Sequence, residues 1–235
     1  MGGFNKYGSS DNYVLLGGGG DKPVSDFMLG NNGHDYVEIG GLKWATMNIG
    51  ASQPSDYGLY FAWGDTQGYT AAQVGSGEGQ KYFGWADCKY NSGGTSPSAA
   101  DMTKYNSTDS KTVLEESDDV AQVNWGGQWR MPTTAEFVAL GAATTNAWVT
   151  DYQGSGVNGR LFTDNTDSSK KLFFPAAGRC RDGSVGYVGS YGFYWSSSLN
   201  TSDVVIGRLL RFLSGSCYIN DDYRRNGFAV RGVVD

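Results

Sequence analysis

The sequence has few charged residues and almost no histidine. Only 18% of its 235 residues are charged, the formal net charge is -6, and Lys and Arg form no cluster. A protein that reads nucleic-acid backbones needs a positive stripe, so we expect no nucleic-acid partner. His34 is the single imidazole, which leaves almost nothing from which to build a Ser-His-Asp or Cys-His arrangement. We therefore expect a protein that is not an enzyme, with no catalytic residues.

Cysteine and long apolar runs are also scarce. Cys88, Cys180 and Cys217 are odd in number and form no CxxC pair, so neither a disulfide framework nor a zinc knuckle is indicated. No apolar run could span a bilayer, and residues 1–20 lack the basic-then-apolar order of a secretion signal. We expect no membrane insertion, and a chain made in a reducing cytosol or processed from a secreted precursor.

Acidic residues form one cluster that could be taken for a metal site. Glu115 and Glu116 lie beside Asp118 and Asp119, but carboxylates also suit the first turn of a helix. We interpret the cluster as a solvated helix start and expect no metal ion or other cofactor. A pair of acids for glycoside cleavage stays possible, because its members can be distant in the chain.

Glycine and aromatic residues are plentiful, with 36 Gly, 15 Tyr and 7 Trp. This balance favours turns and short strands over long helices, and the length suits one domain with a short appendage. We assign residues 1–34 to a Gly-rich N-terminal segment and residues 35–235 to one α+β domain, and the resemblance described below implies that the first is a fibre linker and the second binds a ligand.

Local patterns predict individual elements. Gly40 and Gly41 join two short strands, residues 36–39 and 42–45, in a hairpin. Thr133 and Glu136 have the spacing of a helix capping box, followed by an apolar face with Phe137. Further strands are predicted at residues 57–64, 172–175, 194–197, 208–213, 216–219 and 227–233. Residues 66–101 read as a long surface excursion without chemistry.

Six ordered motifs together carry a family resemblance: residues 44–51, 57–66, 123–133, 174–178, 192–198 and 226–231. The set resembles the paralogous surface domains of Bacteroidetes and Fibrobacter, which are related to the formylglycine-generating-enzyme type of C-type lectin fold. The resemblance covers residues 35–233. It implies a C-type-lectin-like α+β fold with short strands, hairpins, one or two helices and extensive loops. The calcium-dependent sugar motifs Glu-Pro-Asn and Gln-Pro-Asp are absent, so binding of that kind is not expected.

The same fold family includes the variable proteins of diversity-generating retroelements. In these proteins, error-prone reverse transcription at template adenines randomises codons in a C-terminal segment. An AAC codon becomes NNC, which cannot encode Lys, Glu, Gln, Met or Trp. In this chain, 26 of the first 171 residues are Lys, Glu, Gln or Met, whereas none of the last 64 is, and the earlier rate would give about ten. The resemblance therefore implies a variable region at about residues 178–226.

A β-rich segment offers an alternative explanation, because strands disfavour Lys, Glu and Gln. Surface loops such as residues 220–226 would nevertheless accept Lys and Glu. Strand alternation gives a second clue: if Leu210 and Phe212 point inward, then Leu209, Arg211 and Leu213 share an outer face. A binding face would explain exposed leucines there. Burial of both faces would instead require a partner for Arg211.

The variable-protein pattern, carried onto this sequence, gives the candidate ligand-binding positions. They are Arg181, Asp182, Tyr187, Tyr191, Phe193, Leu209, Arg211, Leu213, Ser216, Tyr218, Asn220, Asp221, Asp222 and Tyr223, with Val204 and Val205 as weaker additions. Tyr, Phe and Arg provide large contact area at limited entropy cost. The fixed scaffold would include Trp195, Phe212 and Phe228 as core residues and Gly189 and Gly192 as turns.

Three functions follow as hypotheses. The first is a receptor-binding protein at a phage tail-fibre tip, trimeric by analogy, because residues 9–27 resemble Gly-rich repeats of tail-fibre proteins in phages of gut bacteria. The second is a bacterial surface or pilus-associated adhesin. The third is an enzyme of the formylglycine-generating type, which needs reactive thiols that these scattered cysteines do not supply. In the first two, the partner is a surface protein or glycan of a bacterial cell, and the protein is located on the virion or the cell surface.

Overall fold

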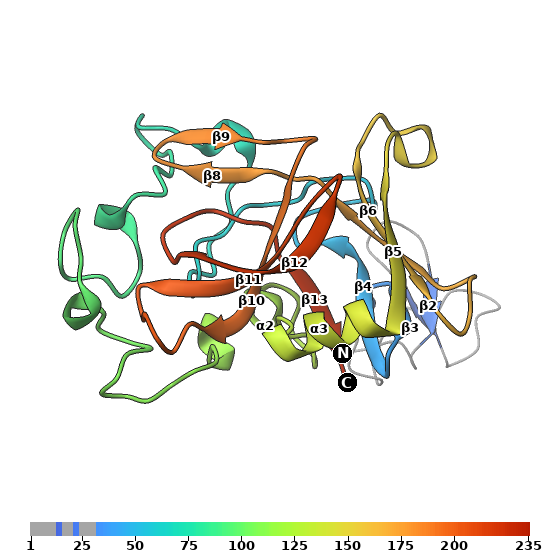
Figure 1. Ribbon diagram of the computed structural model, residues 1–235, viewed down its shortest axis with the longest axis horizontal. Helices are drawn as coiled ribbons and strands as arrows, with labels where there is room; N and C mark the ends of the chain where they lie inside the picture. Colours follow the sequence, from blue (N-terminus) through green and yellow to red (C-terminus); the bar gives the residue numbers. More distant parts are fainter. Residues whose placement is uncertain (1–12, 16–20, 24–31) are drawn as a thin grey trace.

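Two glycines form the turn of the first hairpin of the domain, as predicted. The computed structural model describes residues 13–15, 21–23 and 32–235, and Figure 1 gives their arrangement. Gly40 and Gly41 take φ angles of +63° and +83°, a region open to glycine, and close the hairpin of β3 (Tyr36–Ile39) and β4 (Leu42–Asn48). The C-terminal strand β13 (Arg231–Val234) pairs with the other edge of β4, so the two ends of the domain share one sheet.

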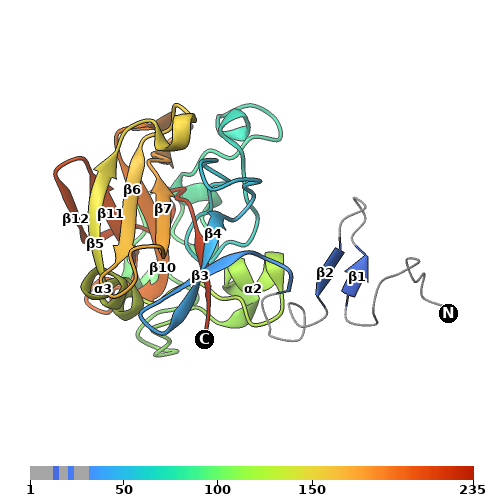
Figure 2. The ribbon, with the colours of Figure 1, turned by 90° about the vertical axis from the view of Figure 1, so that its right-hand side faces the viewer.

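The other strands form small antiparallel sheets, which makes the described part of the chain an α+β protein. These strands are β1 (Tyr13–Leu15), β2 (Asp21–Pro23), β5 (Thr144–Val149), β6 (Gly159–Asp164), β7 (Lys171–Pro175), β8 (Arg179–Arg181), β9 (Ser184–Gly186), β10 (Gly192–Leu199), β11 (Ile206–Leu213) and β12 (Ser216–Tyr223). The sheet orders are β1-β2, β5-β6-β7, β8-β9 and β10-β11-β12. Strands β5, β6 and β7 lie side by side in Figure 2. The predicted segment of residues 1–34 lies mostly outside the described residues.

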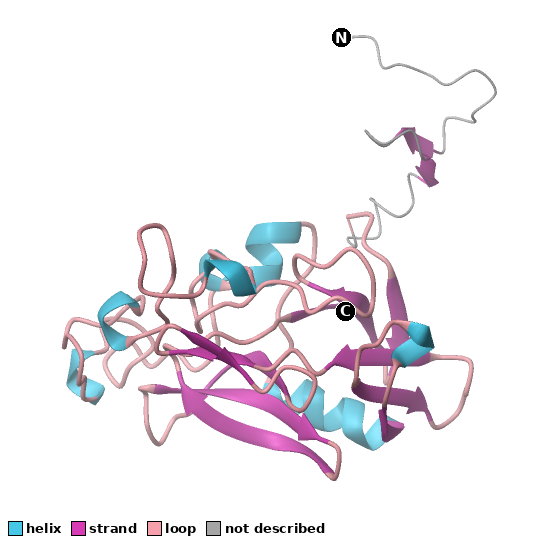
Figure 3. Ribbon diagram, turned by 90° about the horizontal axis from the view of Figure 1, so that it is seen from above, coloured by secondary structure: helices cyan, strands magenta, loops and turns pink. Residues whose placement is uncertain are grey.

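The capping box forms as predicted. Helix α3 (Thr134–Ala143) has Thr133 as its N-cap, and the Thr133 hydroxyl accepts from the Glu136 amide while the Glu136 carboxylate accepts from the Thr133 amide. Phe137 and Leu140 are buried, and α3 packs against the β10-β11-β12 sheet. The other helices are short: α2 (Val120–Trp125) and the 3-10 turns η1 (Ala71–Gln73), η2 (Trp85–Asp87), η3 (Ala99–Asp101), η4 (Glu116–Asp118) and η5 (Tyr152–Gly154). Loops connect most elements (Figure 3).

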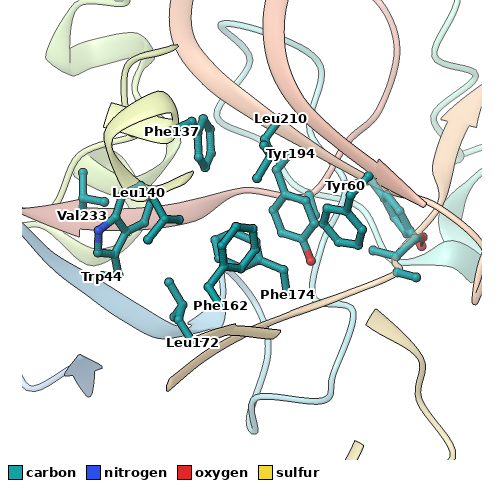
Figure 4. Close-up of a cluster of buried hydrophobic side chains, with 14 of the residues drawn as sticks. Trp44, Tyr60, Phe137, Leu140, Phe162, Leu172, Phe174, Tyr194, Leu210 and Val233 are labelled. Carbon is teal, nitrogen blue, oxygen red and sulfur yellow. Dashed lines mark hydrogen bonds between the residues drawn. The ribbon is translucent and has the colours of Figure 1, made fainter. Parts of the chain in front are cut away.

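Strand β10 divides the core in two. Tyr194 belongs to the first hydrophobic cluster, with Phe174 and Phe212, part of which is drawn in Figure 4. Its neighbour Trp195 belongs to the second cluster, with Phe228. Successive strand residues point to opposite faces, so β10 is buried on both sides. The predicted core roles of Trp195, Phe212 and Phe228 are confirmed, because each is fully buried.

A buried arginine on β13 links the β3-β4-β13 sheet to the β5-β6-β7 sheet. The Arg231 guanidinium donates from Nε to Asn48 Oδ1 at 3.0 Å, from Nη1 to the Ala45 carbonyl at 2.8 Å and from Nη2 to the Phe173 carbonyl at 2.9 Å. It also lies 4.6 Å from the centre of the Phe174 ring. Burial lowers its pKa to about 10, so the side chain stays charged at neutral pH. Hydrogen bonds in place of a carboxylate satisfy this charge.

The acidic cluster is a helix start, but it is not solvated. Asp119 caps α2 by accepting from the Ala121 and Gln122 amides. Asp118 is buried and accepts from Lys89 and Lys104 at 2.8 and 2.5 Å and from the hydroxyls of Tyr90 and Tyr105 at 2.6 and 2.5 Å. The prediction of a solvated cluster was therefore wrong at both aspartates, because cations from the preceding loop segment reach over Asp118.

Three other predictions need correction. Residues 57–64 form isolated bridges, Tyr60 to Tyr69 and Phe61 to Phe228, instead of a strand. The excursion of residues 66–101 is anchored by Phe83, which is fully buried. Residues 220–226 are not a surface loop: β12 continues to Tyr223 and residues 224–226 are buried.

The two predicted turn glycines have different roles. Gly189 has a φ of +75°, as a turn requires. Gly192 lies in β10, where a Cβ would meet the Phe212 ring at 2.0 Å. Its prediction as a turn residue was wrong, because the constraint comes from a ring on the neighbouring strand.

Replacing Asp118 by Asn tests the buried network. Burial alone would raise the pKa of Asp118, but its four hydrogen bonds outweigh burial and hold the pKa well below the usual 3.8. A depressed native pKa stabilises the fold above the unfolded pKa, and this stabilisation is lost as pH falls towards the native pKa. At pH 7 we expect Asp118→Asn to lower the free energy of unfolding by about 2–4 kcal/mol.

Urea unfolding of both proteins at pH 7 and pH 2.5 measures this effect. The difference between wild type and variant should narrow at the lower pH, because Asp118 gains a proton in the unfolded wild type, whereas the folded protein holds the carboxylate ionised to lower pH. A difference that stays constant with pH would contradict the assignment of the effect to the Asp118 carboxylate.

Candidate ligand-binding surface

Eight of the predicted positions share one face of the β10-β11-β12 sheet. The register pairs Phe193 with Arg211 and Arg211 with Tyr218, and directly paired residues lie on the same face. By the same register, the face includes Phe193, Leu209, Arg211, Leu213, Ser216, Tyr218, Asn220 and Asp222. The alternation argument was therefore right about which residues lie together.

One end of this face is covered. Leu209 is fully buried in the second cluster, together with Trp195 and Trp63, and a Cβ at Gly207 would touch both tryptophans. The prediction that Leu209 contacts ligand was wrong, because Trp63, distant in the sequence, packs over the supposed outer face. The alternative, with both faces of the strand buried, holds at this position.

Phe193 is also buried, with 2% of its surface exposed. Its ring stacks on Phe228 at 5.1 Å and on Tyr191 at 5.9 Å between centres. It can therefore form the floor of a site, and its role in ligand binding stays a prediction.

The other end of the face is open. Arg211, Leu213 and Ser216 are partly buried, and 41% of the Tyr218 surface is exposed. The Arg211 guanidinium lies 5.2 Å from the Tyr191 ring centre and 5.9 Å from the Tyr218 ring centre. These cation–π contacts stabilise the Arg211 charge without a carboxylate. The partners that a partly buried Arg211 was expected to need are therefore aromatic rings.

The β8-β9 hairpin extends the open end. Cys180 pairs with Gly227 and Gly178 with Gly192, which fixes the hairpin beside β10. Arg181 and Asp182 are exposed on it, and Tyr187, which follows β9, is 51% exposed. The Tyr187 ring contacts Tyr191 edge-on at 5.1 Å. We call Arg181, Asp182, Tyr187, Tyr191, Arg211, Leu213, Ser216, Tyr218 and Asp222 the open surface.

Two predicted positions lie on the opposite face of β12. Asp221 pairs with Arg208 at 3.2 Å, and Tyr223 contacts the Trp85 ring at 5.4 Å. Asn220 is partly buried beside Leu209. Of the weaker additions, Val205 is buried and Val204 is partly buried, so neither belongs to the open surface.

Sequence reasoning missed two contributors. Arg179 stacks over the Tyr187 ring at 5.0 Å and lies 3.8 Å from Asp222. Its two-residue spacing from Arg181 on one strand could have indicated it. Trp85 comes from the excursion that was expected to carry no chemistry, and no local pattern marks its contact with Tyr223.

The carboxylates of the open surface are already engaged. Asp182 pairs with Arg225 and with Arg181, and the hydrogen bond from Arg225 is the main reason why its pKa is lowered. Asp222 Oδ1 accepts from Asn226 Nδ2 at 2.7 Å. Arg211 has no ion pair or hydrogen bond in the described part of the chain, and its Nε is buried without an acceptor.

In the described part of the chain, cavities lie in three places, of which one, of about 460 Å³, is lined by Trp85, residues 95–99 and Tyr223. Two of about 680 and 780 Å³ lie around α2 and the start of α3. In the first, Arg130 is the only cation of the lining and pairs with both Glu136 and Asp235. Two smaller cavities, of about 160 and 220 Å³, lie on the open surface and share Arg179 and Tyr187. The cavity of about 160 Å³ is lined by Arg211, whose guanidinium has no ion pair, so the candidate site is centred there.

The thiols and the imidazole, which often take part in catalysis, lie outside the open surface. Burial raises the pKa of the Cys88, Cys180 and Cys217 thiols to about 11, 12 and 11, so all three stay protonated at neutral pH. His34 stacks on Trp125 at 4.3 Å. Within residues 32–235, His, Cys, Asp and Glu form no group of three or more that could hold a metal ion. No helix in the described part of the chain is long and apolar enough to cross a membrane.

Comparison of the chain with protein-family models, curated proteins and solved structures finds no match in any of the three. The chemistry of the open surface is therefore interpreted from its own residues.

Alanine variants of two leucines on the same face of β11 test the boundary between its buried end and its open end. Leu209→Ala empties a closed site and should lower the free energy of unfolding by about 2–5 kcal/mol. Leu213→Ala, two residues further on, removes a partly exposed side chain and should cost less than about 1 kcal/mol. Urea unfolding at neutral pH measures both. Equal losses for the two variants would show that the face is not divided as described.

Proposed function

We propose that this chain is a ligand-binding protein whose open surface is a recognition surface diversified by a retroelement, on a C-type-lectin-like scaffold. The open surface would bind a surface protein or glycan of a bacterial cell. Receptor binding at a phage tail-fibre tip, with three copies per tip, is the favoured setting. The supporting observation is the convergence of most predicted variable positions on one continuous surface that is not needed to fill either core.

The segregation of two residue classes supports the diversification part of the proposal. Residues that NNC codons can encode, such as Tyr187, Arg211 and Tyr218, occupy the open surface, and the only tryptophan of the last 64 residues, Trp195, is buried. Randomisation at the open surface would leave the buried members of both hydrophobic clusters in place. Randomisation at Trp195 would destroy one of them.

The buried positions of the motif residues support the scaffold assignment. Trp44, Trp129, Trp195 and Phe228 come from four of the six motifs that carry the family resemblance, and each is at most 1% exposed. Motifs that are distant in sequence thus contribute to the two adjoining cores, as expected of residues that define a fold.

Two alternatives differ in setting and chemistry. A cell-surface adhesin would use the same surface, and neighbouring tail genes or a secretion signal would distinguish it from a phage protein. A formylglycine-generating activity would need a reactive thiolate. The three cysteines, two buried and one partly buried, have raised pKa values and do not favour that chemistry.

Binding of the labelled protein to a panel of gut-bacterial strains, measured by flow cytometry, tests the proposal. We expect the wild type to bind a subset of strains. Tyr218→Thr should weaken that binding at least about tenfold, because exposed tyrosines often dominate interface energies. Tyr187→Asn, which keeps a residue that tolerates positive φ, should also weaken it.

The matched control is Tyr36→Thr on β3, since Tyr36 and Tyr218 have similar exposed fractions of 37% and 41%. This control should bind as the wild type does. All three variants should unfold within about 0.5 kcal/mol of the wild type. If Tyr36→Thr weakens binding as much as Tyr218→Thr, the ligand does not contact the open surface.

A further inference from the structure

The smaller cavity of the open surface has a size and a lining that suit an anionic group. Its volume is about 160 Å³, and it is lined by Arg179, Tyr187, Tyr191, Phe193, Arg211 and Asp222. Pockets that hold drug-sized molecules start at about 300 Å³. The cavity is therefore suited to one ring-sized group of a larger ligand.

Arg211 lacks an acceptor in this cavity. Its guanidinium lies against two rings, 5.2 Å from the centre of Tyr191 and 5.5 Å from that of Phe193. Its buried Nε has no hydrogen-bond partner, and the guanidinium forms no ion pair with any described residue. The two Nη groups also have no partner among the described residues, but they are not buried, so they can donate to an acceptor on a ligand.

Asp222 also lines the cavity, but it does not serve as an acceptor for Arg211. Its Oδ1 accepts from Asn226 Nδ2 at 2.7 Å and from the Tyr223 amide at 2.8 Å, and its Oδ2 lies 3.8 Å from Arg179 Nη1. Asp222 therefore offsets the charge of Arg179. Arg211 remains as one uncompensated positive charge in the cavity lining.

The hydroxyls around Arg211 are free as well. Tyr187, Tyr191 and Tyr218 make ring contacts, but their hydroxyls form no hydrogen bond with other described residues. A phenol hydroxyl both donates and accepts. A ligand that combines a carboxylate with ring hydroxyls matches this set of groups.

We propose that the cavity binds an acidic sugar residue of a glycan, with the carboxylate of a uronic acid on Arg211 and the sugar hydroxyls on the surrounding tyrosines. This assignment rests on the proposed function and names its ligand class. A planar guanidinium fits a carboxylate with two parallel hydrogen bonds. An aspartate or glutamate of an acidic peptide offers the same carboxylate but neither the ring nor its hydroxyls, so it fills the cavity less well.

Titration of the full chain with sodium glucuronate, followed by ligand-observed NMR, tests the assignment. We expect a dissociation constant on the order of 1 mM, weakened by added NaCl because the contact is charged and partly exposed. Glucose, which lacks the carboxylate, should not bind in the same range. A short peptide of Asp and Glu should bind more weakly than glucuronate. Equal binding of glucose, or tighter binding of the peptide, would overturn the assignment to an acidic sugar.

Variants of two arginines on β11 locate the contact. Arg211→Gln should weaken glucuronate binding about tenfold or more, and Arg211→Lys should weaken it less because the charge is kept. Arg208→Gln is the matched control, since Arg208 lies on the opposite face and pairs with Asp221, and it should leave binding unchanged. The salt and glucose measurements use the wild type and do not depend on the folding of any variant.

Competition on cells separates this assignment from the proposed function. If glucuronate displaces the protein from the strains that it binds, the acidic-sugar assignment is supported. If binding needs Tyr218 but glucuronate neither binds nor competes, this assignment fails and the proposed function stands. If the protein binds glucuronate while the Tyr218→Thr and Tyr36→Thr variants bind cells equally, the proposed function fails instead.

Discussion

Burial of β10 on both faces is the constraint on which the rest of the molecule depends. Tyr194 packs into one hydrophobic cluster and Trp195 into the other. A slip of one residue in this strand would exchange the two side chains between clusters, so the register is strongly specified. Because β11 pairs with β10 and β12 pairs with β11, the register of β10 also determines which side chains of β11 and β12 lie on each face of the sheet.

The division between scaffold and surface follows from where the second cluster ends. Trp63 covers the sheet at Leu209, whereas Arg211 lies further along the face and lines a cavity together with Arg179 of the β8-β9 hairpin. Side chains at the open end rest on buried aromatic rings such as Phe193 but fill no core of their own. A rigid base with exchangeable aromatic and arginine side chains loses little entropy on binding, which suits a surface whose residues change while the fold persists.

Local turns and helix caps could be predicted from the sequence. Which side chains are buried by residues from elsewhere in the chain could not. The α3 capping box at Thr133 and the Gly40–Gly41 hairpin depend on neighbours within a few residues, and both form as predicted. Strand alternation also indicated which side chains share the face of Arg211. It could not indicate that Trp63 would bury Leu209, or that lysines from a distant loop would enclose Asp118. Both depend on tertiary contacts, which no local pattern encodes.

The central claim is that the open surface was made by adenine-directed diversification. Sequencing the coding DNA and searching its neighbourhood for a near-copy of the 3′ end of the gene tests it most directly. We predict that the mismatches fall at adenines of the near-copy, in codons of open-surface residues such as Tyr187, Arg211 and Tyr218, and spare those of Trp195 and Phe212. Mismatches at other template bases, or spread evenly over buried and exposed positions, would contradict the account.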